Sequence, residues 1–137
     1  MKSCEASAVV PGFEGMVSRV PLQVHADARG CLIPIEFVDL PFTPRRVFTV
    51  ADVPAGTVRG EHGHQTGQQL LVGLQGRIEI LLRYKKQEAS MVLLPTEPGL
   101  LLHAGVWCRQ TYVQAHSVLL VLASEAYDPA SYFSNWT

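Results

Sequence analysis

The stretch RGEHGH, residues 59–64, holds two of the five histidines of this 137-residue chain, one residue apart. Side chains alternate faces along a β-strand, so on a strand His62 and His64 point to the same side, about 6–7 Å apart. Two imidazoles placed in this way can bind a metal ion or transfer protons near neutral pH. A pair of this kind can also be no more than a solvated structural feature, and the surrounding residues have to separate these alternatives.

The two histidines belong to a longer spaced pattern, GTVRGEHGHQTGQQLLVGLQG, at residues 56–76. The pattern resembles the first cupin motif, G-x5-H-x-H-x3,4-E-x6-G, at five positions: Gly56, His62, His64, Gln69 and Gly76. Gln69 stands where the motif usually has glutamate. In cupins the histidines point from one strand into the mouth of a β-barrel and the fifth position reaches the same site from the next strand. The resemblance favours a functional pair over a solvated one.

Metal binding is the next question, because many cupins add a histidine from a second motif. The corresponding stretch here, GLLLHAGVWCRQ at residues 99–110, has Cys108 at that place. A hard divalent ion would meet two neutral imidazoles and the weak amide of Gln69. A soft site of His62, His64 and Cys108 is chemically possible for zinc. We expect no bound metal and no cofactor.

A sharper resemblance extends over most of the chain, from about Asp27 to Phe133. The segments that carry it are DARGCLIPIEF, PFTPRRVFTV, RGEHGHQ, GLLLHAGVW and VLLVLASEAYDPASYF. Together they resemble the WxcM-like or FdtA-type sugar 3,4-ketoisomerases of the cupin superfamily. The resemblance implies an isomerase that moves the carbonyl of dTDP-4-keto-6-deoxyglucose from C4 to C3 without a required metal. It also implies a homodimer whose subunits exchange an N-terminal strand.

The resemblance assigns His62 and His64 to proton transfer around C3 and C4, because a ketone shift to the neighbouring carbon passes through an enediol. Arg59 is then a cationic partner for the nucleotide-sugar or the enediolate. Arg29 and Arg46 match family positions and could bind the diphosphate, or they could form surface ion pairs. The further candidates for substrate binding are Gln69, His103 and Trp107, although Trp107 also suits the core or a pocket wall.

Several residues depart from the family pattern. Phe48 and Thr49 replace two tyrosines, Cys108 replaces a histidine, and His103 stands where glycine is usual. These changes leave two other functions open. The chain could bind a nucleotide-sugar without turnover or catalyse another isomerisation or cyclisation in a biosynthetic pathway, or it could be a metal-dependent cupin oxygenase or epimerase.

The composition excludes several classes of function. The chain is 47% hydrophobic and 17% charged with a net charge of −1, which argues against disorder and against electrostatic binding of nucleic acid. Its longest apolar run, VLLVLA at residues 118–123, is too short to span a membrane. Three cysteines without metal-ligand spacing indicate a reducing compartment, so we expect a cytoplasmic protein.

Short β-branched and apolar runs separated by Gly, Pro and Asp predict an all-β fold, here a cupin-type antiparallel β-barrel or jelly roll. We expect one domain over residues 1–137, with residues 1–20 poorly defined and a hairpin at Gly76. A short C-terminal helix should begin at Pro129 with Asp128 as its N-cap. The predicted strands are 32–38, 46–52, 70–74, 77–84, 90–94, 100–103 and 117–123.

Overall fold

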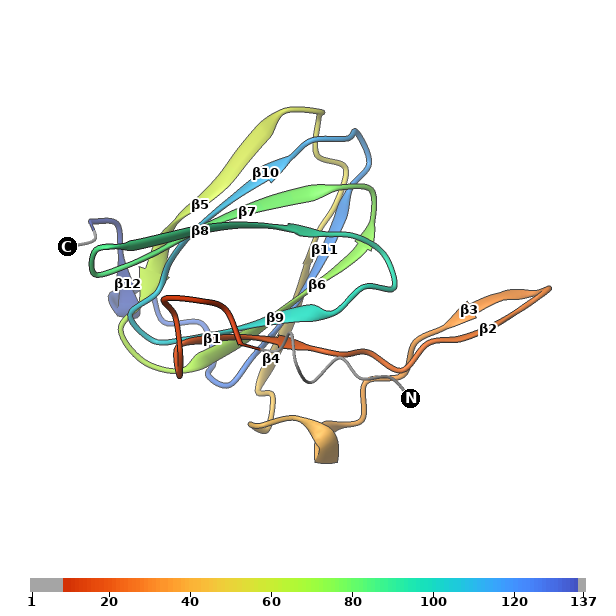
Figure 1. Ribbon diagram of the computed structural model, residues 1–137, viewed down its shortest axis with the longest axis horizontal. Helices are drawn as coiled ribbons and strands as arrows, with labels where there is room; N and C mark the ends of the chain where they lie inside the picture. Colours follow the sequence, from red (N-terminus) through yellow and green to blue (C-terminus); the bar gives the residue numbers. More distant parts are fainter. Residues whose placement is uncertain (1–8, 136–137) are drawn as a thin grey trace.

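The computed structural model describes residues 9–135, which form two facing antiparallel sheets of five strands each (Figure 1). The first sheet has the order β1 (Val17–Val20), β9 (Gly99–His103), β6 (Gln68–Gln75), β11 (Val118–Ala123) and β4 (Arg46–Val50). The second has the order β12 (Tyr132–Phe133), β5 (Thr57–His64), β10 (Trp107–Tyr112), β7 (Ile78–Tyr84) and β8 (Gln87–Leu93). The predicted all-β, cupin-type jelly roll is confirmed.

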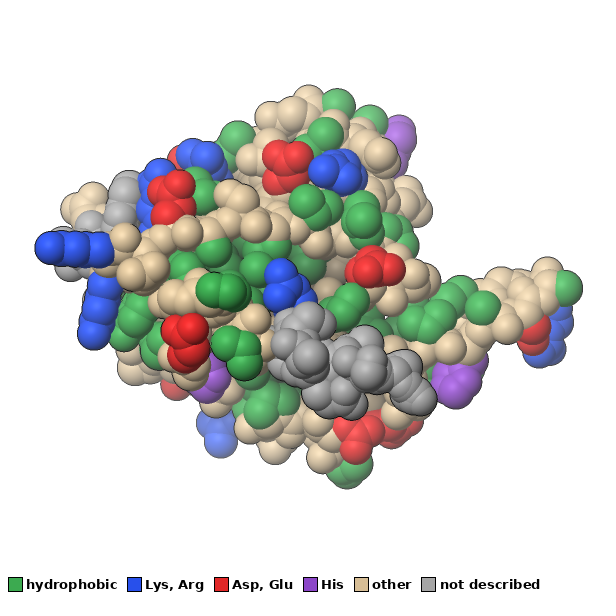
Figure 2. Space-filling model, viewed as in Figure 1, with side chains coloured by type: hydrophobic (Ala, Val, Ile, Leu, Met, Phe, Trp, Pro, Cys, Tyr) green, Lys and Arg blue, Asp and Glu red, His purple; other side chains and the backbone are tan. Residues whose placement is uncertain are grey.

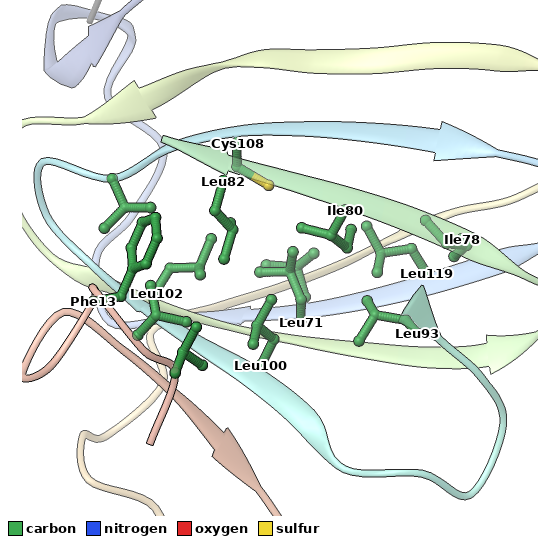
Figure 3. Close-up of a cluster of buried hydrophobic side chains, with 14 of the residues drawn as sticks. Phe13, Leu71, Ile78, Ile80, Leu82, Leu93, Leu100, Leu102, Cys108 and Leu119 are labelled. Carbon is green, nitrogen blue, oxygen red and sulfur yellow. The ribbon is translucent and has the colours of Figure 1, made fainter. Parts of the chain in front are cut away.

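Side chains that alternate along the strands fill the space between the two sheets. Ile78 and Ile80 on β7 point inward and are fully buried, whereas Glu79 points outward and pairs with Arg77 at 3.7 Å. Burying an aliphatic side chain of this size contributes about 1.5–3 kcal/mol. Figure 3 shows this core, which includes Phe13, Leu71, Leu82, Leu93, Leu100, Leu102, Cys108 and Leu119.

The first sheet is covered on its outer face as well. Leu70, Val72 and Leu101 are buried there under apolar side chains of the segment at residues 20–42. Strand β6 is therefore buried on both faces, which explains its nearly continuous apolar sequence. The strand is fixed in place on both sides, and Gln69 at its start is held firmly.

The hairpin predicted at Gly76 is wrong, because β6 and β7 belong to different sheets. The glycine itself is required: Gly76 has a φ of +81°, and a Cβ there would overlap the buried side chain of Ser117. The Ser117 hydroxyl accepts a hydrogen bond from the Arg77 amide at 3.1 Å. Gly76 thus marks the point where the chain crosses from one sheet to the other.

Three other expectations need correction. Of the strand predicted at 32–38, only Leu32 belongs to a strand, because Pro34 cannot donate to a ladder. A 3-10 turn follows at Phe37–Asp39. The C-terminal helix is only a 3-10 turn, η3 (Pro129–Ser131), although Asp128 caps it as predicted by accepting from the Ala130 amide at 3.1 Å. The list of predicted strands also lacks β1, β5, β10 and β12.

A two-stranded arm projects from the barrel (Figures 1 and 2). Its strands are β2 (His25–Asp27) and β3 (Gly30–Leu32), and every residue in them is exposed. At its tip Arg29 donates to the Asp27 carboxylate at 2.6 Å.

Within residues 9–135 no helix is long and apolar enough to cross a membrane.

From residue 9 onward the N-terminal segment packs against the barrel. Val10 and Phe13 are buried in the core, and Val17 begins an edge strand of the first sheet. The expectation for residues 1–8, which include Cys4, lies outside the described part of the chain.

Candidate active site

Strand β5 carries both histidines into the space between the sheets. His62 lies opposite Cys108 of β10, and Cys108 belongs to the interior core, so His62 and His64 share the inner face of β5. Their ring centroids are 5.5 Å apart and the ring planes are nearly perpendicular. Both rings are half-buried. The arrangement predicted from the HxH spacing is the one that the structure has.

A β-bulge brings Arg59 to the same face as the histidines. Counting by twos from His62 would put Arg59 on the outside, but the β5–β10 register shifts so that Glu61 is left as an extra residue. Gly60 and Glu61 both have positive φ, +83° and +64°. As a result Arg59 lies opposite Gln110, whose amide oxygen accepts from the Tyr112 hydroxyl at 2.8 Å.

The facing sheet contributes a row of residues at the same level. Arg46, Ala123, Gln69 and Leu102 are aligned across β4, β11, β6 and β9, with Leu102 in the interior core. The Arg46 guanidinium lies 4.4 Å from the ring centroid of Phe48 and 5.0 Å from that of Tyr127. These two rings hold the cation beside the histidine pair.

Two pockets meet at His64, Gly67 and Gln69. We call the first the barrel pocket; it is lined by His62, His64, Gly67, Gln69, Leu71, Leu102, His103, Val106, Cys108 and Gln110. We call the second the C-terminal pocket; it is lined by Arg46, His64, Thr66, Gly67, Gln68, Gln69, residues 123–126, Asp128, Ser131 and Tyr132. In the C-terminal pocket the buried Gln68 Oε1 has no hydrogen-bond partner among the described residues, so it can accept from a ligand hydroxyl.

Burial makes both imidazoles weaker bases than a free histidine. Desolvation, followed by the effects of His62 and Arg46, lowers the pKa of His64 to about 4, and the opposing effect of Glu125 is smaller. Desolvation also lowers the pKa of His62, partly offset by a hydrogen bond to the Gly60 backbone. Both rings are therefore neutral at pH 7, and a neutral imidazole can accept a proton.

The thiol beside the pair is protonated. Burial raises the pKa of Cys108 to about 12, and burial likewise raises that of Tyr112 to about 12. Among residues 9–135 no group of three His, Cys, Asp or Glu side chains is placed to hold a metal ion. Cys108 and Tyr112 are therefore uncharged at pH 7.

The two pockets bring together five of the eight predicted site residues: Arg46, His62, His64, Gln69 and His103. Arg59 lies on the inner face of β5 opposite Gln110, but it is exposed and lines neither pocket. His103 is paired in register with Gln68. Trp107 is buried away from both pockets, under the Arg83 guanidinium, and its Nε1 donates to the Ser134 carbonyl at 2.9 Å. Arg29 is at the tip of the projecting arm with its side chain 90% exposed.

Tyr132 is a site residue that the sequence analysis missed. It lies opposite His64 in the β12–β5 ladder, and its ring centroid is 4.4 Å from that of His64 and 4.6 Å from that of His62. The signal was present, because the segment YDPASYF matches the family pattern at this tyrosine. Nothing local to the sequence shows that a tail about 70 residues away returns to the HxH strand.

A jelly-roll barrel with a neutral histidine pair inside its mouth defines this protein as a cupin. Residues 16–137 match the family described as WxcM-like, C-terminal (FdtA), and the chain belongs to this family. The curated TDP-4-oxo-6-deoxy-alpha-D-glucose-3,4-oxoisomerase of Aneurinibacillus thermoaerophilus is 31% identical over 111 residues, which cover 80% of each chain.

Solved structures show the same relationship. QdtA, a sugar 3,4-ketoisomerase from Thermoanaerobacterium thermosaccharolyticum in complex with TDP, is 35% identical with a TM-score of 0.83, covering 88% of each chain. A mutant of QdtA in complex with TDP-4-keto-6-deoxyglucose is 34% identical with a TM-score of 0.82, covering 87% of each chain. The WlaRB TDP-quinovose 3,4-ketoisomerase of Campylobacter jejuni is 31% identical with a TM-score of 0.81, covering 87% of this chain and 92% of that one.

Proposed function

We propose that this protein is a nucleotide-sugar 3,4-ketoisomerase that moves the carbonyl of a dTDP-4-keto-6-deoxyhexose from C4 to C3. The observation that carries the proposal is the neutral His62–His64 pair inside a barrel of this family, with the Arg46 cation beside His64. Relatives that act on TDP-linked sugars support the choice of substrate class.

The reaction is a proton transfer in two halves. One imidazole removes the proton at C3 while a donor protonates the oxygen at C4, which gives the enediol. Loss of the proton on the C3 oxygen and return of a proton to C4 then complete the 3-keto product. No redox cofactor is needed, because the sugar is oxidised at C3 and reduced at C4 in the same molecule.

The residues suit these steps. His64 is the proposed base, since its neutral form persists down to a pH of about 4. His62 is proposed to hold or protonate the oxygen, and Arg59 and Arg46 to stabilise the enediolate or the diphosphate. Gln69 and His103 line the barrel pocket as candidates for contacts with the sugar. Trp107 fits an indirect role, because it anchors the C-terminal segment that carries Tyr132.

Incubation with dTDP-4-keto-6-deoxyglucose, followed by NMR of the sugar, tests the proposal. We expect the 3-keto sugar to appear at a rate proportional to enzyme concentration. Binding of the nucleotide-sugar without a 3-keto product would favour the other function considered from the sequence, a cupin that binds such a ligand without turnover or converts it differently. A preparation treated with a chelator serves as control and is expected to retain activity.

A homodimer in the cytoplasm completes the proposal. Strand β1 is an edge of the first sheet, and residues 9–135 leave the strands β2 and β3 of the arm exposed. Pairing with a second copy would protect such an edge. Arg29 lies on this arm, so we propose that any contact with substrate is made in the partner's site. Cys31 is exposed and Cys108 is buried, and a reducing compartment would keep both as thiols.

A further inference from the structure

The ring of Tyr132 contacts both imidazoles at once. It meets His64 edge to face, with the two ring planes 64° apart, and lies tilted at 35° over His62. Residues directly opposite each other in an antiparallel ladder are in contact, and diagonal neighbours are within reach of an aromatic side chain. One side chain of β12 therefore limits how both histidines can turn.

The backbone around Tyr132 is fixed by several independent contacts. The Gln65 amide donates to the Ser131 carbonyl at 2.7 Å, and the Trp107 indole donates to the Ser134 carbonyl at 2.9 Å. Gly63 leaves room for the Phe133 ring, which a Cβ there would overlap. These contacts hold the backbone of β12 at three points next to the histidine pair.

We propose that Tyr132 is a positioning residue for the isomerisation, holding both imidazoles in their mutual orientation through its ring rather than through its hydroxyl. The C-terminal strand β12 is then part of the active site, not only a closing strand. The inference rests on the proposed function, since it assumes that the histidine pair transfers protons. In this proposal β12 keeps the two imidazoles in position and shields them from water.

The shielding gives a readout that a purely structural role would not move. His64 faces His62 on its own strand, Arg46 of β4, Glu125 after β11 and Tyr132 of β12. Of these, Tyr132 is a neutral ring that excludes water, and burial is the largest cause of the lowered pKa of His64. Removing the ring should raise this pKa from about 4 toward 6.5.

The experiment compares Tyr132→Leu, Tyr132→Phe and Phe133→Leu in the full chain, by NMR titration of His64 without substrate and by steady-state kinetics. We expect Tyr132→Leu to raise the His64 pKa and to lower kcat about 10- to 100-fold, the range for a misplaced catalytic group. Tyr132→Phe should leave the His64 pKa unchanged and keep kcat within about threefold of wild type. Phe133→Leu, which loosens the same strand but keeps the Tyr132 ring, should change the His64 pKa much less than Tyr132→Leu.

Other results would overturn the proposal. An unchanged pKa and kcat in Tyr132→Leu, or an equal pKa shift in Phe133→Leu, would remove the ring's role. If Tyr132→Phe is as slow as Tyr132→Leu, the hydroxyl and not the ring is responsible for the effect. If Tyr132→Leu does not fold, NMR titration of His64 in the wild-type protein still tests the shielding. A wild-type His64 pKa near 6.5 would reject it. Failure of the proposed function is distinguishable, because the titration needs no activity.

Discussion

His64 is the residue on which the chemistry depends most directly. If it is the base, His64→Asn removes the proton acceptor but keeps a side chain of similar size and polarity. We expect turnover to fall by about 10² to 10⁴, the range for losing general-base catalysis, while the nucleotide-sugar still binds. The measurement is kcat and KM on the same preparation.

A comparison of stability separates catalysis from structure. If the pair were only structural, His62→Asn and His64→Asn would lower Tm and retain activity in proportion to the folded fraction. The catalytic interpretation predicts nearly unchanged Tm with lost turnover for His64→Asn. For His62→Asn it predicts an additional rise in KM. A His64→Asn enzyme that turns over like wild type would disprove the proposed mechanism.

The lowered pKa of His64 also has a consequence for folding. Between pH 6.5 and about 4 the unfolded chain binds a proton at this residue and the folded chain does not, so the free energy of unfolding rises with pH across that window. We expect Tm to fall as the pH drops from 6.5 to 4, and His64→Asn to flatten this slope. An identical slope in both proteins would show that other groups cause the pH dependence.

Single site residues could be predicted from the sequence where the spacing of a motif places them. The HxH spacing on a strand predicted the pair, and the cupin spacing predicted Gln69 in the same pocket. Tyr132 and the neutral state of His64 were not predictable from spacing, because both depend on segments distant in sequence that meet only in the folded barrel.

The bulge in β5 is the element that sets the position of Arg59. Gly60 has a φ of +83°, and a Cβ there would lie 3.0 Å from the Cys108 carbonyl oxygen. Gly60→Ala should therefore cost about 1–3 kcal/mol of stability and distort the bulge, so that Arg59 leaves the inner face. We expect KM to rise, measured beside Tm on the purified variant.

Gly15→Ala is the matched control for this change. Gly15 also has a positive φ, +76°, but no atom lies within 4 Å of a Cβ built there and it is not part of β5. It should show comparable backbone strain with an unchanged KM. Equal effects on KM in both variants would mean that strain in general, and not the bulge, changes binding.

The bulge also shows why element-level prediction was incomplete. Strict alternation puts His62 and His64 inward but Arg59 outward, and the bulge, with positive φ at Gly60 and at Glu61, reverses this for Arg59. A glutamate gives no sequence signal for that conformation. Similarly, a glycine between two strand-forming runs, such as Gly76, does not reveal whether the chain returns in the same sheet or crosses to the other.

The overall fold follows from two features of the sequence: the alternation of apolar and polar residues and the short lengths of the apolar runs. Apolar runs of four to eight residues indicate strands, and their number is enough for two facing sheets around one core. What the pattern could not show is the second buried face of the first sheet. Its cover comes from the residues on either side of the arm, where Ile35 and Phe42 pack onto the sheet without forming a strand.

The arm is where the assembly of the whole molecule can be tested. Leu32 is 66% exposed on it, and an apolar side chain on an uncovered strand is a suitable contact for a second copy. Light scattering should give a mass of about 30 kDa, twice the 15.0 kDa of one chain. Leu32→Asp should shift the protein toward 15.0 kDa, whereas Val113→Asp, which adds the same charge beyond the end of β10, should not. A wild-type monomer at micromolar concentration would contradict the dimer and with it the proposed reach of Arg29 into a partner's site.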